Sequence, residues 1–165
     1  MIGRLSKCHL APEVQRQTTH RARIGHETAK KHLHDMNDQP PSRGTLLSIV
    51  ELGGYPNFTS VYAEAGYQVV MVRSLRKALA AIKKHQPKVI VAEFNFQSDF
   101  RDRTSNLESL LAAVQRQPHT KIIVFYESQY SVQFERLRSR FSINAALAYP
   151  IEVDALRKQL DAMSA

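Results

Sequence analysis

Short apolar runs alternate with amphipathic segments from residue 45 to the end of the chain. The apolar runs predict five strands, at 45–52, 67–72, 88–94, 121–126 and 143–149. Because these runs are continuously apolar, we expect strands buried on both faces, which is typical of a parallel sheet with helices on either side.

The intervening segments repeat their apolar residues every three or four positions, which predicts helices. They lie at 57–66, 74–86, 105–117, 130–141 and 152–163. Ser74 is a candidate N-cap, and Gly66 closes the first helix. The residues expected to face inward on the last four helices are Leu75, Ala78, Leu79 and Ile82; Leu107, Leu110, Leu111 and Val114; Val132, Phe134 and Leu137; and Val153, Leu156 and Leu160. Five strands alternating with five helices predict a doubly wound sheet in the order 2-1-3-4-5.

Residues 1–43 show neither pattern, and they hold five of the seven histidines. No Cys or carboxylate completes a rigid metal site with these histidines, so we expect a flexible, disordered tail. The stretch 37–44 contains paired prolines and predicts a linker. Met36 stands just before the linker and is an alternative start of the chain. The single folded domain is therefore expected at 44–165.

The formal net charge of +8 first suggests nucleic acid, but its distribution argues against that role. Residues 1–43 carry 8 Lys and Arg against 4 Asp and Glu, and residues 44–165 carry 15 against 11. No basic run interleaved with aromatic residues appears in the domain. The single cysteine and the lack of a long apolar stretch predict a cytoplasmic protein without a membrane segment.

Polar and aromatic residues cluster where the predicted strands end. In a doubly wound sheet, an active site lies beyond the carboxyl ends of the strands. Those ends are Glu51–Gly54, Glu93–Asn95, Tyr126–Ser128 and Tyr149–Pro150.

Two stretches resemble the response-regulator receiver domain of the CheY-like family. They are YAEAGYQVVMVRSLRKALAAIKKHQPKVIVAE and ALAYPIEVDALRKQL, and the resemblance covers residues 45–163. A receiver of this family carries two acidic residues that hold Mg²⁺, an Asp that accepts a phosphoryl group, a Ser or Thr that contacts it, and a Lys before a proline. Cations must offset the charge of the carboxylate and phosphoryl oxygens.

The chain departs from the receiver pattern at almost every one of these positions. The acidic pair corresponds to Glu51 and Leu52, the phosphoacceptor to Glu93, the Ser or Thr to Tyr126, and the Lys to Tyr149, before Pro150, where the family commonly has a cis peptide. A backbone carbonyl at Asn95 would be the third metal contact. We therefore expect a degenerate pocket without a firm metal site, in which Glu51 and Glu93 could keep weak Mg²⁺ binding.

Each substitution has a physical consequence for the predicted pocket. Glu93 is one methylene longer than Asp, and Tyr149 offers no charge for a phosphoryl oxygen. Tyr126 is expected to fill the space of the small hydroxyl. Glu93 is interpreted either as a mimic of the activated state or as a solvated carboxylate at the strand end. Repulsion from Glu51 is expected to raise the pKa of at least one of the two.

The leading hypothesis is a phosphorylation-independent pseudo-receiver that binds a protein of a signalling or regulatory system, without enzymatic activity or a cofactor. A first alternative is an atypical active phosphoacceptor, for which Asp99 and Asp102 are the Asp residues near the third strand end. A second is a flavodoxin-like nucleotide or cofactor binder, suggested by Gly53 and Gly54 after the first strand.

The expected partner face is the last helix–strand–helix unit, because this surface commonly mediates contacts in receivers. Arg136, Arg138 and Arg140 surround its first helix, and Tyr149 ends the neighbouring strand. An ordinary solvated helix face is the alternative interpretation. We expect a protein partner rather than nucleic acid, and a homodimer remains open.

Overall fold

The computed structural model describes residues 42–96 and 107–163, which form a five-stranded parallel sheet between two layers of helices. The strand order is β2-β1-β3-β4-β5, so the predicted doubly wound fold is confirmed. The strands are β1 (Thr45–Ile49), β2 (Gln68–Val72), β3 (Val89–Glu93), β4 (Lys121–Glu127) and β5 (Ala145–Tyr149). The helices are α2 (Thr59–Glu64), α3 (Leu75–His85), α4 (Leu107–Val114), α5 (Ser131–Arg138, after the 3₁₀ turn Ser128–Tyr130) and α6 (Val153–Ala162).

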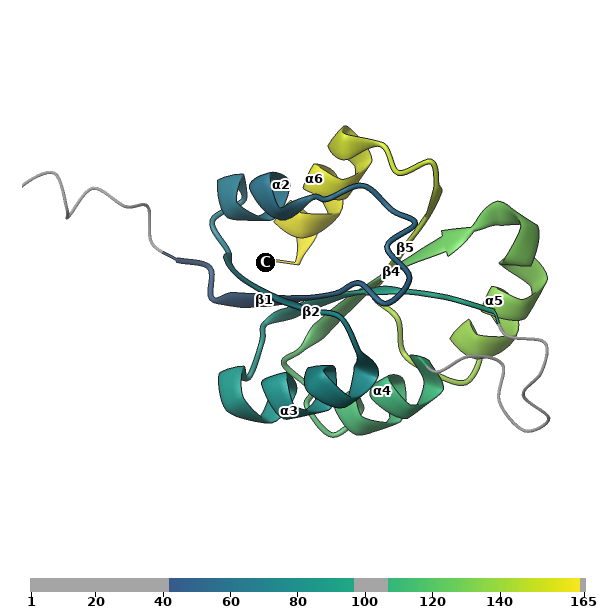
Figure 1. Cartoon of the computed structure of the whole chain (residues 1–165), viewed down its shortest axis with the longest axis horizontal. Coiled ribbons are helices and arrows are strands. Elements are labelled where there is room, and N and C mark those ends of the chain that lie inside the picture. Colours follow the sequence, from purple (N-terminus) through teal and green to yellow (C-terminus); the bar gives the residue numbers. More distant parts are fainter. Residues whose placement is uncertain (1–41, 97–106, 164–165) are drawn as a thin grey trace, which may run out of the picture. The chain divides into compact units, whose positions relative to one another are not determined.

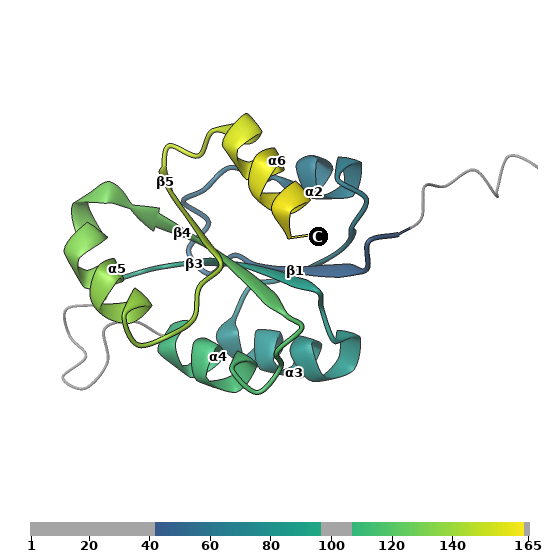
Figure 2. The ribbon, with the colours of Figure 1, turned by 180° about the vertical axis from the view of Figure 1, so that it is seen from behind.

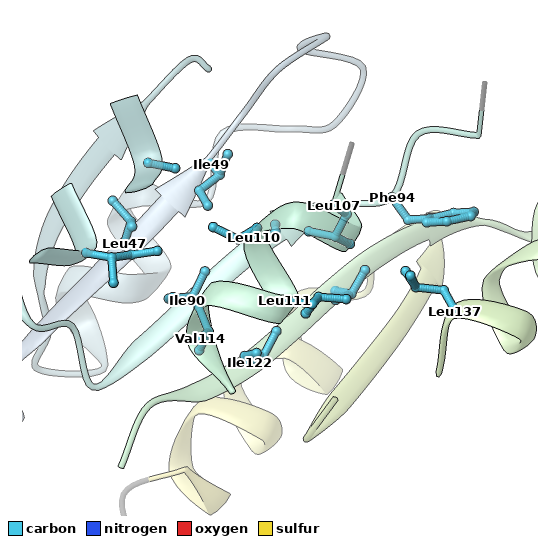
Figure 3. Packing of buried hydrophobic residues seen from close by; sticks show 14 of the residues in the cluster. Leu47, Ile49, Ile90, Phe94, Leu107, Leu110, Leu111, Val114, Ile122 and Leu137 are labelled. Atoms are coloured by element: carbon cyan, nitrogen blue, oxygen red, sulfur yellow. The ribbon is translucent and has the colours of Figure 1, made fainter. Parts of the chain in front are cut away.

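Helices cover both faces of the sheet, as continuously apolar strands require. Helices α2 and α6 lie on one face, whereas α3 and α4 lie on the other, with α5 beside β4 and β5 (Figures 1 and 2). The larger core joins β1, β3 and β4 to the inner sides of α3, α4 and α5, as Figure 3 shows. A second core lies under α2 and α6. Strand β3 is the middle strand of the five and is buried at every residue, so its end lies at the middle of the sheet edge.

Local sequence explains where α3 starts and ends and where α2 turns. The Ser74 hydroxyl accepts a hydrogen bond from the Lys77 amide (3.4 Å), which confirms the predicted N-cap. Gln86 ends α3 in the left-handed region, and Pro87, which cannot continue the helix, follows it. Gly66 has the predicted positive φ of 86° after α2. Gly54 lies outside any helix or strand, and its neighbour Gly53 carries the positive φ there.

Two residues predicted to face inward are exposed. Val132 is 64% exposed because it lies in the first turn of α5, two positions before the buried Phe134 and hence on the opposite side of the helix. Val153 is 38% exposed because it is the first residue of α6, where the sheet no longer covers it. The remaining predicted inward positions are buried or packed against the core.

Two differences from the sequence pattern concern the loop after β1 and the start of the domain. Strand β1 ends at Ile49 rather than at residue 52, so Glu51 and Leu52 belong to the loop that follows it. Arg43, assigned to the linker, forms an ion pair with Asp161 (2.8 Å) and donates its backbone N–H to the Gly66 carbonyl. The rest of the predicted tail, residues 1–41, lies outside the described residues.

Candidate functional site

The carboxylate of Glu93 is buried beneath the loop that follows β1. Strands β1 and β3 pair in register from Leu46 and Val89 to Ile49 and Ala92, which sets Glu93 beside the start of this loop. Glu93 is only 6% exposed, and its Oε2 accepts hydrogen bonds from the backbone N–H groups of Glu51 (3.2 Å) and Leu52 (3.3 Å). The interpretation of Glu93 as a solvated strand-end carboxylate is therefore wrong.

Glu51 is also bound to backbone, but on a different element. Its Oε1 accepts a hydrogen bond from the Leu75 N–H (3.0 Å), at the first residue of α3. A carboxylate here satisfies a free N–H group and interacts favourably with the positive end of the helix dipole. Glu93 thus joins the loop to β3, and Glu51 joins it to α3. Each carboxylate is the hydrogen-bond acceptor for backbone N–H groups at this edge of the sheet.

Burial is the main cause that raises the pKa of Glu93. The hydrogen bonds from the Leu52 and Glu51 amides, and the nearby Asn95 side chain, act in the opposite direction, and the charge of Glu51 adds a smaller upward effect. The pKa of Glu93 is therefore raised, as predicted. Desolvation contributes more to this rise than the repulsion from Glu51, on which the prediction was based.

We expect Glu93→Gln to change how stability depends on pH. A native pKa above the unfolded value means that protonated Glu93 stabilises the fold below the unfolded pKa, and that this contribution is lost as the pH rises through the native pKa. The free energy of unfolding of the wild type should therefore fall relative to Glu93→Gln as the pH rises above the unfolded carboxyl pKa of about 4.3. Urea unfolding at a series of pH values measures it, and parallel profiles would contradict it.

An aromatic group covers the other side of the loop. Tyr55 packs on Phe125 (ring centroids 5.7 Å apart) and edge-on against Tyr149 (5.8 Å), and Phe58 also meets Phe125 (5.7 Å). Tyr149 occupies the Lys position of the receiver pattern, and it remains 47% exposed. The Tyr149 ring adds an aromatic contact to Tyr55, but unlike a lysine it places no positive charge near Glu93. The Tyr149–Pro150 peptide bond is cis.

Tyr126 lies on the other face of the sheet. Its ring stacks on Phe134 of α5, with centroids 4.4 Å apart and an interplanar angle of 10°. Successive residues of a strand point to opposite faces, so Phe125 joins the group with Tyr55 while Tyr126 joins the core under α5. Tyr126 does not line the cavity at Glu93, and the prediction that it fills the hydroxyl's space there is wrong.

A cavity of about 320 Å³ lies between the loop and the ends of β1, β2 and β3. Glu51, Leu52 and Glu93 line it, whereas Asn95, Tyr126, Tyr149 and Pro150 do not. The sequence prediction missed most of the other lining residues, among them Ser48, Tyr55, Phe58 and Arg73. The spacing of Tyr55 and Phe58 in the stretch GGYPNF was the available signal, because aromatic residues in a loop after a strand end can close over that end.

The three arginines of the expected partner face have different environments. Arg140 pairs with Glu108 (3.0 Å), whose side chain is only 7% exposed. Arg138 pairs with the exposed Glu135 on its own helix (3.3 Å). The exposed Arg136 lies beside Val132 on the outer side of α5. Arg140 therefore connects the turn at the end of α5 to Glu108 on α4. Arg136 and Val132 remain accessible for contact with a partner.

We expect Arg140→Ala to lower the free energy of unfolding by about 1–2 kcal/mol, because it removes the cation beside a buried carboxylate. Arg136→Ala is the matched control on the same segment, with an expected change within about 0.5 kcal/mol. Urea denaturation of both variants measures the difference. Equal effects would mean that the Arg140–Glu108 pair contributes nothing to the fold.

Within residues 42–96 and 107–163, no group of three or more His, Cys, Asp and Glu side chains is placed to hold a metal ion. In the same part of the chain, no helix is long and apolar enough to cross a membrane. Asp99 and Asp102, named for an atypical phosphoacceptor, lie outside the described residues.

No family model and no curated protein sequence matches the chain. Solved receiver domains do resemble it. A response regulator receiver domain from Clostridium thermocellum is 14% identical with a TM-score of 0.59, covering 73% of this chain and 94% of that one. The receiver domain of a modulated diguanylate cyclase from Desulfovibrio desulfuricans is 16% identical (TM-score 0.58; 73% and 93% covered).

The chemotaxis response regulator CheY4 of Vibrio cholerae is similar at 19% identity, with a TM-score of 0.56 and coverage of 73% of this chain and 98% of that one. At these identities the likeness establishes the fold. The described part of the chain therefore has the fold of a response-regulator receiver domain.

Proposed function

We propose that this chain is a phosphorylation-independent, receiver-like module that binds a protein partner in signal transduction and has no enzymatic activity. The observation that carries the proposal is the use of both remaining carboxylates as acceptors for backbone amides. Glu93 binds the Glu51 and Leu52 amides, and Glu51 binds the Leu75 amide. A carboxylate in such a role supports a loop conformation rather than a reaction.

The requirements of phosphoryl transfer favour the same proposal. A carboxylate attacks phosphorus only where cations offset the charge of its own and the phosphoryl oxygens. Tyr149 replaces the expected ammonium group, and Leu52, which is 72% exposed, replaces one metal-binding carboxylate. Restoring one acid would leave the cationic part of the site missing.

Phosphorylation tests this proposal directly. We expect neither the wild type nor Glu93→Asp to gain a phosphoryl group when incubated with acetyl phosphate and Mg²⁺. The shorter Asp would lose the contacts to the loop amides without gaining a lysine or a second acid. Intact-mass spectrometry measures the gain, with a phosphorylatable receiver domain as the positive control. A stable phosphoryl adduct on either protein would contradict the proposal.

Partner binding is tested with the exposed part of α5. A protein captured from the native cell, identified and then purified, should bind the chain equally with and without acetyl phosphate. Arg136→Ala should weaken this complex, whereas Lys158→Ala on α6, also an exposed cation, serves as the matched control. Binding that requires the phosphodonor would contradict the proposed function. An unchanged affinity for Arg136→Ala would move the interface away from α5.

A further inference from the structure

The cavity at Glu93 contains polar atoms that the described fold leaves unused. Within residues 42–96 and 107–163, Glu93 Oε1 and the Tyr55 hydroxyl are buried without a hydrogen bond of ordinary geometry, and the Asn95 side chain, which is outside the cavity lining, is close to the Glu93 carboxylate. Glu93 is 6% exposed, and both Glu93 and Tyr55 line the cavity. Buried polar groups in native proteins almost always have a partner, so unsatisfied ones beside a cavity indicate a place for a ligand.

The charges around the cavity favour a ligand with a positive charge. Two carboxylates, Glu51 and Glu93, line it with a single cation, Arg73. Glu127 lies near enough that its charge, after burial, helps to raise the pKa of Tyr55. An anion here would face an excess of negative charge, whereas a cation would be attracted. Oε1 of an ionised Glu93 can only accept hydrogen bonds, so the ligand must supply a donor.

The aromatic residues that line the cavity favour a ligand with a flat ring. Tyr55 and Phe58 each pack against Phe125 with ring centroids 5.7 Å apart, and all three residues line the cavity. Aromatic faces attract cations and stack with planar rings. A volume of about 320 Å³ is within the range of small-molecule sites.

We propose that this cavity binds a small aromatic cation with N–H donors, an amidine or a primary amine, whose charged group bonds to Glu93 Oε1 and whose ring lies among Tyr55, Phe58 and Phe125. The site goes beyond the proposed partner binding. It gives the module a chemical input at the sheet edge where a receiver takes a phosphoryl group.

Benzamidine is a suitable probe for this site. We expect it to bind the ¹⁵N-labelled full chain saturably, with a dissociation constant of about 1 mM and amide shifts centred on the loop 50–58 and Glu93. Benzoate and benzyl alcohol have the same ring without the cation, and they should bind at least about tenfold more weakly. The absence of saturable binding by benzamidine, or equal binding of benzoate, would overturn the proposal.

Substitutions locate the binding site. Glu93→Gln should weaken benzamidine binding about tenfold, because it removes the charged acceptor. Arg73→Ala should strengthen it about threefold, because it removes the opposing cation from the exposed rim without touching the loop contacts. Glu152→Gln, an equal charge change outside the cavity lining, should have no effect.

If Glu93→Gln and Arg73→Ala both bind like the wild type, the cation lies elsewhere and the proposal fails. These measurements use the chain alone. Their failure is therefore distinguishable from failure of the proposed function, which is decided by phosphorylation and partner capture.

Discussion

Phe134→Ala is expected to lower the free energy of unfolding by about 3–5 kcal/mol. Phe134 is completely buried, stacks on Tyr126 (4.4 Å) and meets Phe94 edge-on (5.4 Å). It therefore joins α5 to both β4 and the end of β3. Removing its ring takes away the transfer free energy of a buried side chain and leaves a cavity that three elements would have to close. Urea or thermal unfolding measures the effect.

Val132→Ala is the matched control for Phe134→Ala, since the two residues lie two positions apart on α5. Val132 is 64% exposed, so its truncation should change the free energy of unfolding by no more than about 0.5 kcal/mol. A loss below about 1.5 kcal/mol for Phe134→Ala would mean that the stacked pair with Tyr126 does not hold α5 on the sheet.

Glu93→Ala is expected to cost about 2 kcal/mol, the second largest effect. It removes the acceptor shared by the Glu51 and Leu52 amides, and leaving buried or partly buried donors without a partner costs about 1–3 kcal/mol. Faster amide hydrogen exchange at these two residues should accompany the loss, because the loop would no longer be tied to β3.

Glu93→Gln is the control that keeps an acceptor of the same length. Its stability near neutral pH should lie within about 1 kcal/mol of the wild type, since the lost carboxylate bonds are offset by a lower desolvation cost. If Gln and Ala prove equally destabilising, the negative charge rather than the hydrogen-bonding geometry supports the loop.

The fold could be predicted because its signals are local and repeated. Each strand is a continuous apolar run, and each helix has its own stripe, so the order of elements followed from the sequence. The errors fell at element ends. Val153 is the first residue of its helix, where periodicity cannot decide whether the sheet still extends beneath it. Val132 lies two positions from Phe134 and therefore cannot share its buried face.

The site was predicted in position but not in chemistry. The strand ends correctly gave Glu51, Leu52 and Glu93 as neighbours. The burial of Glu93 depends on a loop that folds back so that its amides meet the carboxylate, and no residue pattern encodes that return. The prediction that Tyr126 fills the space of the hydroxyl failed for a related reason. A strand end still alternates its side chains, and the core under α5 accepts the Tyr126 ring.

The two carboxylates also form a mechanical connection between the centre of the sheet and a helix. Glu93 at the end of β3 binds the Glu51 amide, and the Glu51 side chain binds the Leu75 amide at the start of α3. A displacement at Glu93 can therefore pass to the start of α3 through Glu51. A double-mutant cycle of Glu93→Ala and Glu51→Ala should then give a coupling energy of about 0.5–1 kcal/mol. Such a value would mean that Glu51 transmits changes between the end of β3 and the start of α3.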